Sequence, residues 1–354
     1  MKTLVLGRAA IVRIINEVGI DTLMDQTIER LEKALLSISP QADILPVRAG
    51  FSLQEPFPGI IEWMPYHERG SCITIKVVSY SPLNPTIRGV PTILATVSRF
   101  DASSGSLQVL CDGLLITALR TGAASAVATR HLAILDARIM GMVGAGAQAV
   151  AQVHALSRVL PLEECIVYDV DPSAALSFLS RSPVPELRIR VAALPELLAQ
   201  SDVICTATSV SAGAGPVIKD EGLLPHVHIN AVGSDLAGKT ELPPSVLRRS
   251  LVCPDTIEQA LREGECQQLV AEQIGPDLFT LVRHADSYAS WRFKPTVFDS
   301  TGCALQDHIA LDVILDAAKS CDVGDYLELQ AQPSDALNPY NLTDSVAVLD
   351  PEQV

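Results

Sequence analysis

An amphipathic helix is the first element that the distribution of apolar residues predicts. From Asp21 to Ile38, apolar residues recur every three to four positions with polar residues between them. One stripe of this predicted helix carries Met24, Ile28, Leu31 and Leu35. Such a stripe indicates a helix that buries one face and leaves the other in water.

Strand-like patterns follow between Gly59 and Asp112. Cys72 to Tyr80 has the alternation of a strand. Thr92 to Phe100 and Ser106 to Cys111 are separated by the segment Asp101-Ala102-Ser103-Ser104-Gly105, which is typical of a hairpin loop. This region therefore predicts a sheet that contains at least one hairpin.

A long helix rich in alanine is predicted from Leu114 to Leu132. The short apolar run from Arg138 to Val143 then precedes a segment of helical spacing from Ala147 to about Leu160. A second apolar run, Cys165 to Tyr168, ends at Asp169. The order of strand, glycine turn, helix, strand and acid is that of a nucleotide-binding βαβ unit.

The second half of the chain continues this alternation of strands and helical segments. The further predicted strands are Leu187 to Val191, Val203 to Thr206, Val227 to Val232, Leu251 to Cys253, and Thr296 to Phe298. The pattern implies a parallel, doubly wound sheet and an α/β fold. Ala304 to Ser320 predicts a closing helix that can pack back on the first domain. The tail from Gln332 to Val354, rich in Pro, Asp and Asn, is expected to be extended or mobile.

Composition excludes several classes of protein. The chain has 354 residues, 48% of them hydrophobic and 19% charged, which suits a globular protein with two domains. The net charge of −15, without a basic cluster, argues against a nucleic-acid or anionic-membrane partner. No run of about 18 apolar residues predicts a transmembrane helix. The first residues lack the apolar core and cleavage site of a signal peptide. Eight scattered cysteines without metal-ligand spacing predict reduced core thiols, no metal site and a cytoplasmic location.

The glycine motif Gly144-Ala145-Gly146-Ala147-Gln148-Ala149 is the strongest single chemical signal. Gly144 permits a tight turn, and Gly146 lets the backbone approach a pyrophosphate. The helix that follows offers free N–H groups and a positive dipole end. A plain βαβ turn is the alternative, but the surrounding strands and the acid favour a dinucleotide site.

Asp169 lies where a carboxylate can accept hydrogen bonds from a ribose diol. It would repel a 2′-phosphate, and the segment from Val170 to Ser180 contains no Lys or Arg to pair with one. The sequence therefore favours NAD over NADP. Asp171 is a competitor for the same role, although Asp-Pro-Ser is also a common helix start.

Two loops at the carboxyl ends of predicted strands are candidates for ligand contacts. The small hydroxyl residues in Thr206-Ala207-Thr208-Ser209 could line a cofactor, or could simply form a polar turn. Asp235, in Gly233-Ser234-Asp235, would face the nicotinamide side of the crevice and could transfer protons. It could equally be a plain turn aspartate.

Four charged residues in the first domain stand in apolar surroundings. Lys76, in mid-strand, is either a solvated edge residue or a buried functional one. Arg120 is the only charge between Leu114 and Thr129, so it needs an anionic partner from the protein or a substrate. Arg48 is either a surface charge or an anion clamp. Burial of Glu62 would raise its pKa.

These residues fall within segments that resemble the ornithine cyclodeaminase/μ-crystallin family, and most closely its lysine cyclodeaminase branch. The resemblance extends from about Leu6 to about Tyr340. The segments that carry it are Glu62-Trp63-Met64-Pro65, Lys76 with Tyr80-Ser81-Pro82, Thr117-Ala118-Leu119-Arg120-Thr121-Gly122-Ala123, the glycine motif, Asn230-Ala231-Val232-Gly233-Ser234-Asp235, Gly238-Lys239-Thr240-Glu241-Leu242, Arg262-Glu263-Gly264-Glu265, and Phe298-Asp299-Ser300-Thr301-Gly302.

The resemblance implies a homodimer and a particular division of the chain. Residues 1–130 with 304–335 would form an α+β substrate-binding and dimerisation domain. Residues 131–303 would form a Rossmann-type, doubly wound NAD-binding domain, and residues 336–354 an extended tail.

The resemblance also assigns roles to individual residues. Arg48, Lys76 and Arg120 would hold the α-carboxylate of a basic L-amino acid. Asp235 would be the catalytic acid/base, with Glu62 close to the same amines and Lys76 also in the catalytic group. The implied cofactor contacts are Thr92, Arg120, Thr121, Gly144, Ala145, Gly146, Ala147, Gln148, Asp169, Thr206, Ala207, Thr208, Ser209, Val232, Gly233, Lys239, Ser300 and Thr301.

The implied reaction converts L-lysine to L-pipecolate and ammonia. It proceeds by oxidation to an imine, cyclisation, loss of ammonia and re-reduction, so that NAD is not consumed. Ornithine cyclodeamination to L-proline stays open, because the two substrates differ by one methylene, worth about 1–3 kcal/mol in a fitted pocket. A ketimine reductase or an amino-acid dehydrogenase of the same family also stays open, as does a protein that only binds its ligand.

Overall fold

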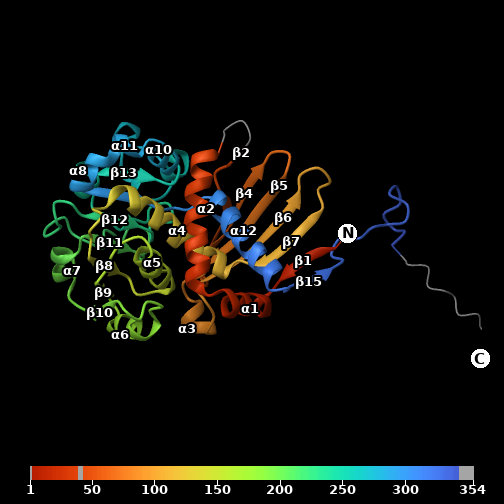
Figure 1. Ribbon diagram of the computed structural model, residues 1–354, viewed down its shortest axis with the longest axis horizontal. Helices are drawn as coiled ribbons and strands as arrows, with labels where there is room; N and C mark the ends of the chain where they lie inside the picture. Colours follow the sequence, from red (N-terminus) through yellow and green to blue (C-terminus); the bar gives the residue numbers. More distant parts are fainter. Residues whose placement is uncertain (1, 39–42, 343–354) are drawn as a thin grey trace, which may run out of the picture.

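The chain folds into two α/β units side by side, each built on its own sheet (Figure 1). This computed structural model describes residues 2–38 and 43–342. Helix α4 (Leu114–Leu132), which has the bounds that the sequence predicts, contacts helices of both units. The predicted fold class, a Rossmann-type parallel sheet beside an α+β unit, is confirmed.

The first sheet has eight strands and combines both ends of the described chain. Their order is β15-β1-β7-β6-β5-β4-β2, with β3 paired to β4. The strands are β1 (Thr3–Leu6), β2 (Asp43–Ile44), β3 (Ala49–Leu53), β4 (Gly59–Glu68), β5 (Cys72–Tyr80), β6 (Ile93–Asp101), β7 (Leu107–Asp112) and β15 (Asp325–Leu327). Paired strands are antiparallel, apart from the parallel pair β1 and β7. The predicted strand and hairpin within this region are confirmed.

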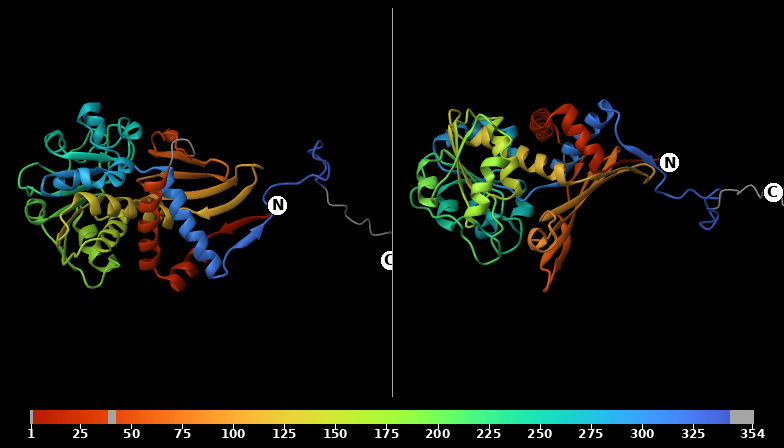
Figure 2. Two further views of the ribbon diagram at one scale, coloured as in Figure 1. Left: turned by 45° about the horizontal axis from the view of Figure 1, so that its top comes forward. Right: turned by 90° about the horizontal axis from the view of Figure 1, so that it is seen from below.

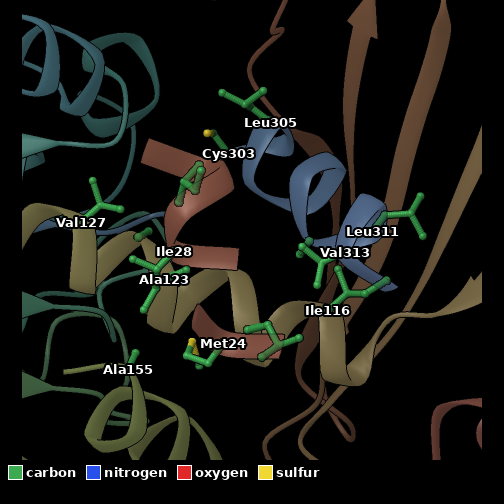
Figure 3. Packing of buried hydrophobic residues seen from close by; sticks show 14 of the residues in the cluster. Met24, Ile28, Ile116, Ala123, Val127, Ala155, Cys303, Leu305, Leu311 and Val313 are labelled. Atoms are coloured by element: carbon green, nitrogen blue, oxygen red, sulfur yellow. The ribbon is translucent and has the colours of Figure 1, made fainter. Parts of the chain in front are cut away.

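Helices cover one face of the first sheet (Figure 2). They are α1 (Arg8–Val18), α2 (Ile20–Ser37) and α12 (Ala304–Ser320), while α3 (Asn84–Arg88) lies between β5 and β6. The predicted amphipathic stripe on α2 is buried, and α12 packs against α2, α4 and the sheet. Figure 3 shows side chains of α2, α4 and α12 meeting in this core.

The other face of the first sheet is apolar and uncovered in the single chain. Phe51, Ile61, Val77 and Leu94 lie on the neighbouring strands β3, β4, β5 and β6, and each is between 38% and 67% exposed. An exposed apolar surface of this kind is typical of an interaction site.

The second sheet has seven parallel strands in the order β10-β9-β8-β11-β12-β14-β13. They are β8 (Ile139–Val143), β9 (Glu164–Tyr168), β10 (Arg188–Val191), β11 (Val203–Thr206), β12 (His228–Ala231), β13 (Leu251–Pro254) and β14 (Thr296–Asp299). The strand order reverses between β8 and β11. Ligands of open α/β sheets bind at such a switch point, beyond the carboxyl ends of the strands.

Helices connect the strands of the second sheet. They are α5 (Ala147–Ser157), α6 (Pro172–Arg181), α7 (Leu194–Gln200), α8 (Pro244–Arg249), α9 (Ile257–Ala260), α10 (Leu278–Arg283), α11 (Ala285–Tyr288) and the 3-10 turns η1 (Glu265–Gln268), η2 (Ala271–Gln273) and η3 (Ala289–Phe293). Helix α5 packs closely on α4, because a Cβ at Gly122 would lie 2.8 Å from the Ala151 carbonyl oxygen. Gly122 therefore permits the close contact that joins the two units.

The thiols and the ends of the chain complete the comparison with the sequence. All eight cysteines are free and seven are buried, as predicted. None of the helices within residues 2–38 and 43–342 is long and apolar enough to cross a membrane.

Strand β1 and helix α1 are not evident in the sequence pattern. Residues 334–341, within the predicted tail, form a loop closed by a hydrogen bond from Ser334 N to Asn341 O. Residues 343–354 of that tail lie outside the described residues.

Candidate functional site

A cavity opens where the carboxyl ends of the second sheet face the first sheet. Together with the solvent at its mouth it measures about 580 Å³. It is lined by Arg48, Ile60, Glu62, Met64, Val78, Tyr80, Ile93, Thr117, Arg120, Thr121, Gln148, Val232, Asp235, Ser300 and Thr301. Residues from both units therefore line one space, beside the switch point of the parallel sheet.

The glycine motif forms a tight turn between β8 and α5. Gly144 has φ +93°, and a Cβ there would lie 2.7 Å from the Ala207 carbonyl oxygen, so larger residues are excluded. Gly146 differs, because a Cβ there would meet nothing within 4 Å. The open space beside Gly146, at the start of α5, fits the close approach of a pyrophosphate.

Asp169 follows β9 and lies beside this turn. Its Oδ2 accepts a hydrogen bond from the Ala145 amide at 2.6 Å, and its Oδ1 accepts one from the Asp171 amide at 2.9 Å. Asp171 instead caps α6, accepting from Ser173 N at 2.9 Å. The geometry keeps Asp169 as the candidate ribose ligand and gives Asp171 the capping role.

Arg181 is a basic residue that the fold brings close to the glycine turn and Asp169. It lies one position after the segment that lacks Lys and Arg, at the end of α6. Its guanidinium nevertheless reaches back to the glycine turn, where Nη2 donates to the Ala145 carbonyl at 2.6 Å. The fold therefore brings a cation near the acid, held by backbone carbonyls of Ala145 and Ala174.

Glu241 organises the two loops that the sequence proposes for ligand contacts. It is completely buried and accepts hydrogen bonds at 2.7–2.8 Å from both the hydroxyl and amide of Thr208, the Thr206 hydroxyl and the Gly233 amide. Burial raises the pKa of Glu241 despite these donors. The hydroxyls of Thr206 and Thr208 are therefore committed to Glu241, which leaves the loop backbone and Ala207 to face a ligand.

Several buried polar atoms around the cavity have no hydrogen-bond partner within the described chain. They include Gln148 Oε1, Ser300 Oγ and Thr301 Oγ1, all on residues that line the cavity. Buried polar groups are normally satisfied, so these atoms indicate a polar ligand. With the open space at Gly146, they fit a dinucleotide that runs from the glycine turn into the cavity.

Arg48 crosses from the first unit to the second. Its Nη2 donates to the Asp235 carbonyl at 2.9 Å and also pairs with Glu263, while Nη1 donates to the Thr301 carbonyl at 3.1 Å. Glu62 Oε2 lies 3.6 Å from Nε. The Arg48 Nε is buried without a hydrogen bond to any described residue, and the Glu62 carboxylate is the acid that faces it.

Lys76 and Arg120 share one carboxylate, that of Asp307 on α12. The Lys76 Nζ donates to Asp307 Oδ1 at 2.6 Å, and Arg120 Nε lies 3.3 Å from the same oxygen without hydrogen-bond geometry. Burial, with the nearby Arg120 charge, lowers the pKa of Lys76 to about 8. Arg120 therefore has a protein carboxylate as its partner, and its side chain also lines the cavity.

The acidic side of the cavity consists of Glu62 and Asp235. Burial raises the pKa of Glu62, and the Arg48 charge opposes that rise. Asp235 Oδ1 lies 3.0 Å from Lys239 Nζ, and that ammonium also lies 5.3 Å from the centre of the Tyr80 ring. Burial alone would lower the pKa of Lys239, but Asp235 and Tyr80 raise it above its ordinary value. Lys239 is thus bound to Asp235 in this structure.

The structure does not bring every predicted residue to the cavity. Lys76 is completely buried behind it, and Thr92 contacts Ser81 through its carbonyl in the loop before β6. Neither lines the cavity. Gly144, Ala145, Gly146, Ala147 and Asp169 lie at the glycine turn, and Thr206, Ala207, Thr208, Ser209 and Gly233 at the ends of β11 and β12.

Three acids at the site were not singled out from the sequence. Glu241 and Glu263 lie within segments that carry the family resemblance, and their position there was the available signal. Asp307 lies in the apolar helix 304–320, where a buried acid requires a cation. Glu241 holds the Thr206 and Gly233 loops, and Glu263 holds Arg48. Asp307 holds Lys76.

Further buried acids hold the loops around these residues. Asp299 accepts hydrogen bonds from the Glu265 and Cys266 amides, and Asp255 accepts one from the Gly302 amide. Burial raises the pKa of Asp299 to about 6. A Cβ at Gly302 would collide with the Arg120 guanidinium, so Gly302 makes room for the cation at the cavity.

Comparison with known proteins places the chain among enzymes of one family. The model of the ornithine cyclodeaminase/mu-crystallin family matches residues 8–322. An L-lysine cyclodeaminase of Streptomyces rapamycinicus is 43% identical over 97% of this chain and all of its own length.

Two solved structures are similar over nearly the whole chain. One shows a lysine cyclodeaminase and its recognition of L-lysine, L-ornithine and L-2,4-diaminobutyric acid; it has a TM-score of 0.94 and 49% identity, and covers 97% of this chain and 100% of that chain. The other is an archaeal alanine dehydrogenase dimer with bound NAD, with a TM-score of 0.83, 28% identity, and coverage of 93% of this chain and 100% of that chain.

Proposed function

The chain belongs to the ornithine cyclodeaminase/mu-crystallin family, and on this premise we propose that it is an NAD-dependent lysine cyclodeaminase. It converts L-lysine to L-pipecolate and ammonia. Bound NAD would take a hydride from the substrate Cα and return it to the cyclic imine, so that no NADH accumulates.

One observation carries this proposal: the charges that line the cavity complement a basic L-amino acid. Arg48 and Arg120 line the cavity, and the Nε of each is buried without a hydrogen bond to any described residue. Glu62 and Asp235 line the same cavity. A substrate with one carboxylate and two amines matches two cations and two carboxylates, and charge-assisted hydrogen bonds would orient its Cα.

The residues that would hold NAD lie from the glycine turn to the cavity. The Gly146 backbone and the start of α5 would bind the pyrophosphate, and Asp169 the adenosine ribose. Gln148, Ser300 and Thr301 have buried, unsatisfied oxygens that would contact the remaining polar groups of the cofactor. Loops held by Glu241, together with Val232, would form the wall next to the nicotinamide.

Asp235 is the proposed acid/base. Lys239 holds its Oδ1, so we assign the other oxygen, Oδ2, to accept a proton from the terminal ammonium of the substrate. The resulting neutral amine can attack the imine carbon. Glu62, whose pKa is raised by burial, would bind the same end of the substrate and share the proton.

The cavity wall also has an apolar part that would limit hydrolysis of the imine. Ile60, Met64, Val78 and Ile93 supply side chains from β4, β5 and β6, and Val232 adds one from the second unit. These residues would keep water from the imine, and would contact the methylene chain of the substrate.

Lysine is the proposed substrate because of the relatives at 43% and 49% identity. L-ornithine, which would give L-proline, is the second candidate, since the similar solved structure also recognises it. Net use of NAD(H), as by an amino-acid dehydrogenase or a ketimine reductase, is the third. All three would use the same cavity.

The proposed assembly is a homodimer that forms through the uncovered apolar face of the first sheet. Residues 1–130 with 304–335 would supply the substrate and dimerisation domain, and residues 131–303 the NAD domain. The exposed Phe51, Ile61, Val77 and Leu94 support this face as the interface, and the related alanine dehydrogenase is a dimer.

The test is incubation of the purified protein with catalytic NAD⁺ and, separately, L-lysine and L-ornithine. We expect ammonia and a cyclic imino acid from L-lysine, without accumulation of NADH absorbance. Stoichiometric NADH would make the protein a dehydrogenase. If neither amino acid reacts and the protein instead consumes NAD(P)H with cyclic ketimines, it is a reductase.

A further inference from the structure

The last described segment of the chain forms an arm that leaves the body of the molecule. Strand β15 pairs with β1 at one edge of the first sheet, and the Leu107 amide donates to Gln330 Oε1 at 2.7 Å. Beyond that point, the arm projects away from both units in every view (Figures 1 and 2). The start of the arm is therefore fixed to the sheet through β15 and Gln330, while residues 331–342 extend into solvent.

The arm is folded, although it does not pack on its own body. Ser334 N donates to Asn341 O at 3.2 Å, and Asn338 N donates to Asp335 O at 3.0 Å. The side chains of Asp335 and Asn338 accept hydrogen bonds from the amides of Leu337 and Tyr340. Every hydrogen bond described for residues 331–342 is internal to the arm, so its loop has a defined shape.

This loop presents apolar side chains to water. Leu337 is 93% exposed and Tyr340 is 91% exposed, the highest fractions among the large apolar residues of the described chain. Leu342 is 53% exposed. Single exposed apolar residues are common, but a hydrogen-bonded loop that directs two large apolar side chains outward is typical of a surface that a partner covers.

We propose that the arm, residues 331–342, binds a second copy of this chain, with Leu337 and Tyr340 buried at the contact. The arm starts from the edge of the sheet whose uncovered apolar face carries Phe51 and Val77. In a twofold dimer through that face, the arm of each copy would be free to reach the other copy, because its described hydrogen bonds leave its own body uncontacted. The inference rests on the dimer of the proposed function, and adds the segment that fastens it.

The extent of similarity to relatives agrees with this assignment. The arm lies beyond residue 322, where the match to the family model ends. The alignment with the Streptomyces enzyme nevertheless covers 97% of this chain, and so includes most of the residues after 322. The arm is thus an addition to the family core that this chain shares with a lysine cyclodeaminase.

The first experiment measures dimer dissociation by sedimentation velocity for the full chain and for the double variant Leu337→Ser/Tyr340→Ser. We expect the dimer dissociation constant of the full chain to be at least about 100-fold lower than that of the double variant, because burying each side chain contributes a factor of ten or more. Leu135→Ser is the matched control, since Leu135 is 69% exposed in the second unit, and should leave the dimer unchanged. Equal dimer dissociation constants for the double variant and the full chain would overturn the proposal.

A second experiment identifies what the arm touches. A photo-reactive benzoylphenylalanine replaces Tyr340, and irradiated full-length protein is separated on a denaturing gel. A covalent species of twice the chain mass supports the proposal. A dimer in solution that gives only internal adducts overturns the arm contact alone, whereas a monomer overturns both this inference and the proposed dimer.

Discussion

Asp307 and Lys76 form an ion pair that is completely removed from solvent, with Nζ 2.6 Å from Oδ1. The same oxygen lies 3.3 Å from Arg120 Nε, so one carboxylate faces two cations. A buried charge without its partner is costly, and the three residues come from α12, β5 and α4. This triad therefore links the C-terminal helix to the cation that lines the cavity.

Replacement of Asp307 by Asn should strongly destabilise the fold. Two buried cations would lose the carboxylate that they share, and we expect a loss of about 3–5 kcal/mol in the free energy of unfolding. Urea unfolding followed by circular dichroism measures this loss. Asp312→Asn is the control, because Asp312 lies on the same helix but is 34% exposed; it should cost about 1 kcal/mol or less. Equal losses in the two variants would contradict the role given to Asp307.

The stability of the protein should depend on Lys76 at alkaline pH. Burial lowers the pKa of Lys76 from 10.5 to about 8, so between these values the folded protein has lost a proton that the unfolded chain keeps. Unfolding then takes up a proton, and the free energy of unfolding rises with pH across this window. Across the whole window, this proton uptake raises the free energy of unfolding by about 3 kcal/mol.

Lys76→Met isolates this contribution. We expect the difference in unfolding free energy between the natural chain and the variant to shift in favour of the natural chain from pH 8 to pH 10. Urea titrations at several pH values measure it. Parallel pH curves for the two proteins would show that Lys76 keeps the same charge in both states.

Asp235→Asn should lower turnover by orders of magnitude and leave NAD binding nearly intact. The amide cannot accept the proton of the substrate ammonium, and general acid–base groups typically contribute about 10²–10⁴-fold. Ammonia release measures turnover, and fluorescence titration measures NAD affinity. Asp220→Asn is the control, because Asp220 pairs with Arg249 away from the cavity. Turnover within about twofold of the natural chain would remove Asp235 from the mechanism.

Asp169→Ala should weaken NAD more than it weakens the amino-acid substrate. Its carboxylate is the candidate ribose ligand and also holds the Ala145 amide in the glycine turn. Loss of hydrogen bonds to a charged group costs about 1.5–3 kcal/mol, or about 10- to 150-fold in affinity. Fluorescence titration with NAD measures the first effect, and the KM for the amino acid measures the second.

Asp171→Ala is the matched comparison for Asp169. It should lower stability by about 1 kcal/mol through loss of the α6 cap, with little change in NAD affinity. The reverse result, in which only Asp171→Ala weakens NAD, would move the ribose contact to Asp171.

Periodicity located the elements whose stripes or runs are strong. Helices α4 and α12 and strand β5 have the bounds that the pattern predicts, because each segment is uniformly apolar or regularly spaced. Strand β15 is short and exposed, so nothing local distinguishes it from a loop; its pairing with β1 defines it. Local pattern therefore suffices where one element buries its own stripe, but not where distant strands complete a sheet.

The sequence alone determined the glycine turn and predicted Asp169 and Asp235 as site residues, since the order of strand, turn and helix places them at one edge of a parallel sheet. It could not determine which charges pair. Arg48 and Glu263 are far apart along the chain and meet only when the two units pack. Lys76 was predicted at the substrate, but the tertiary structure buries it against Asp307, out of the cavity. Pairing depends on three-dimensional proximity in a poorly solvated interior, and only the folded chain supplies that proximity.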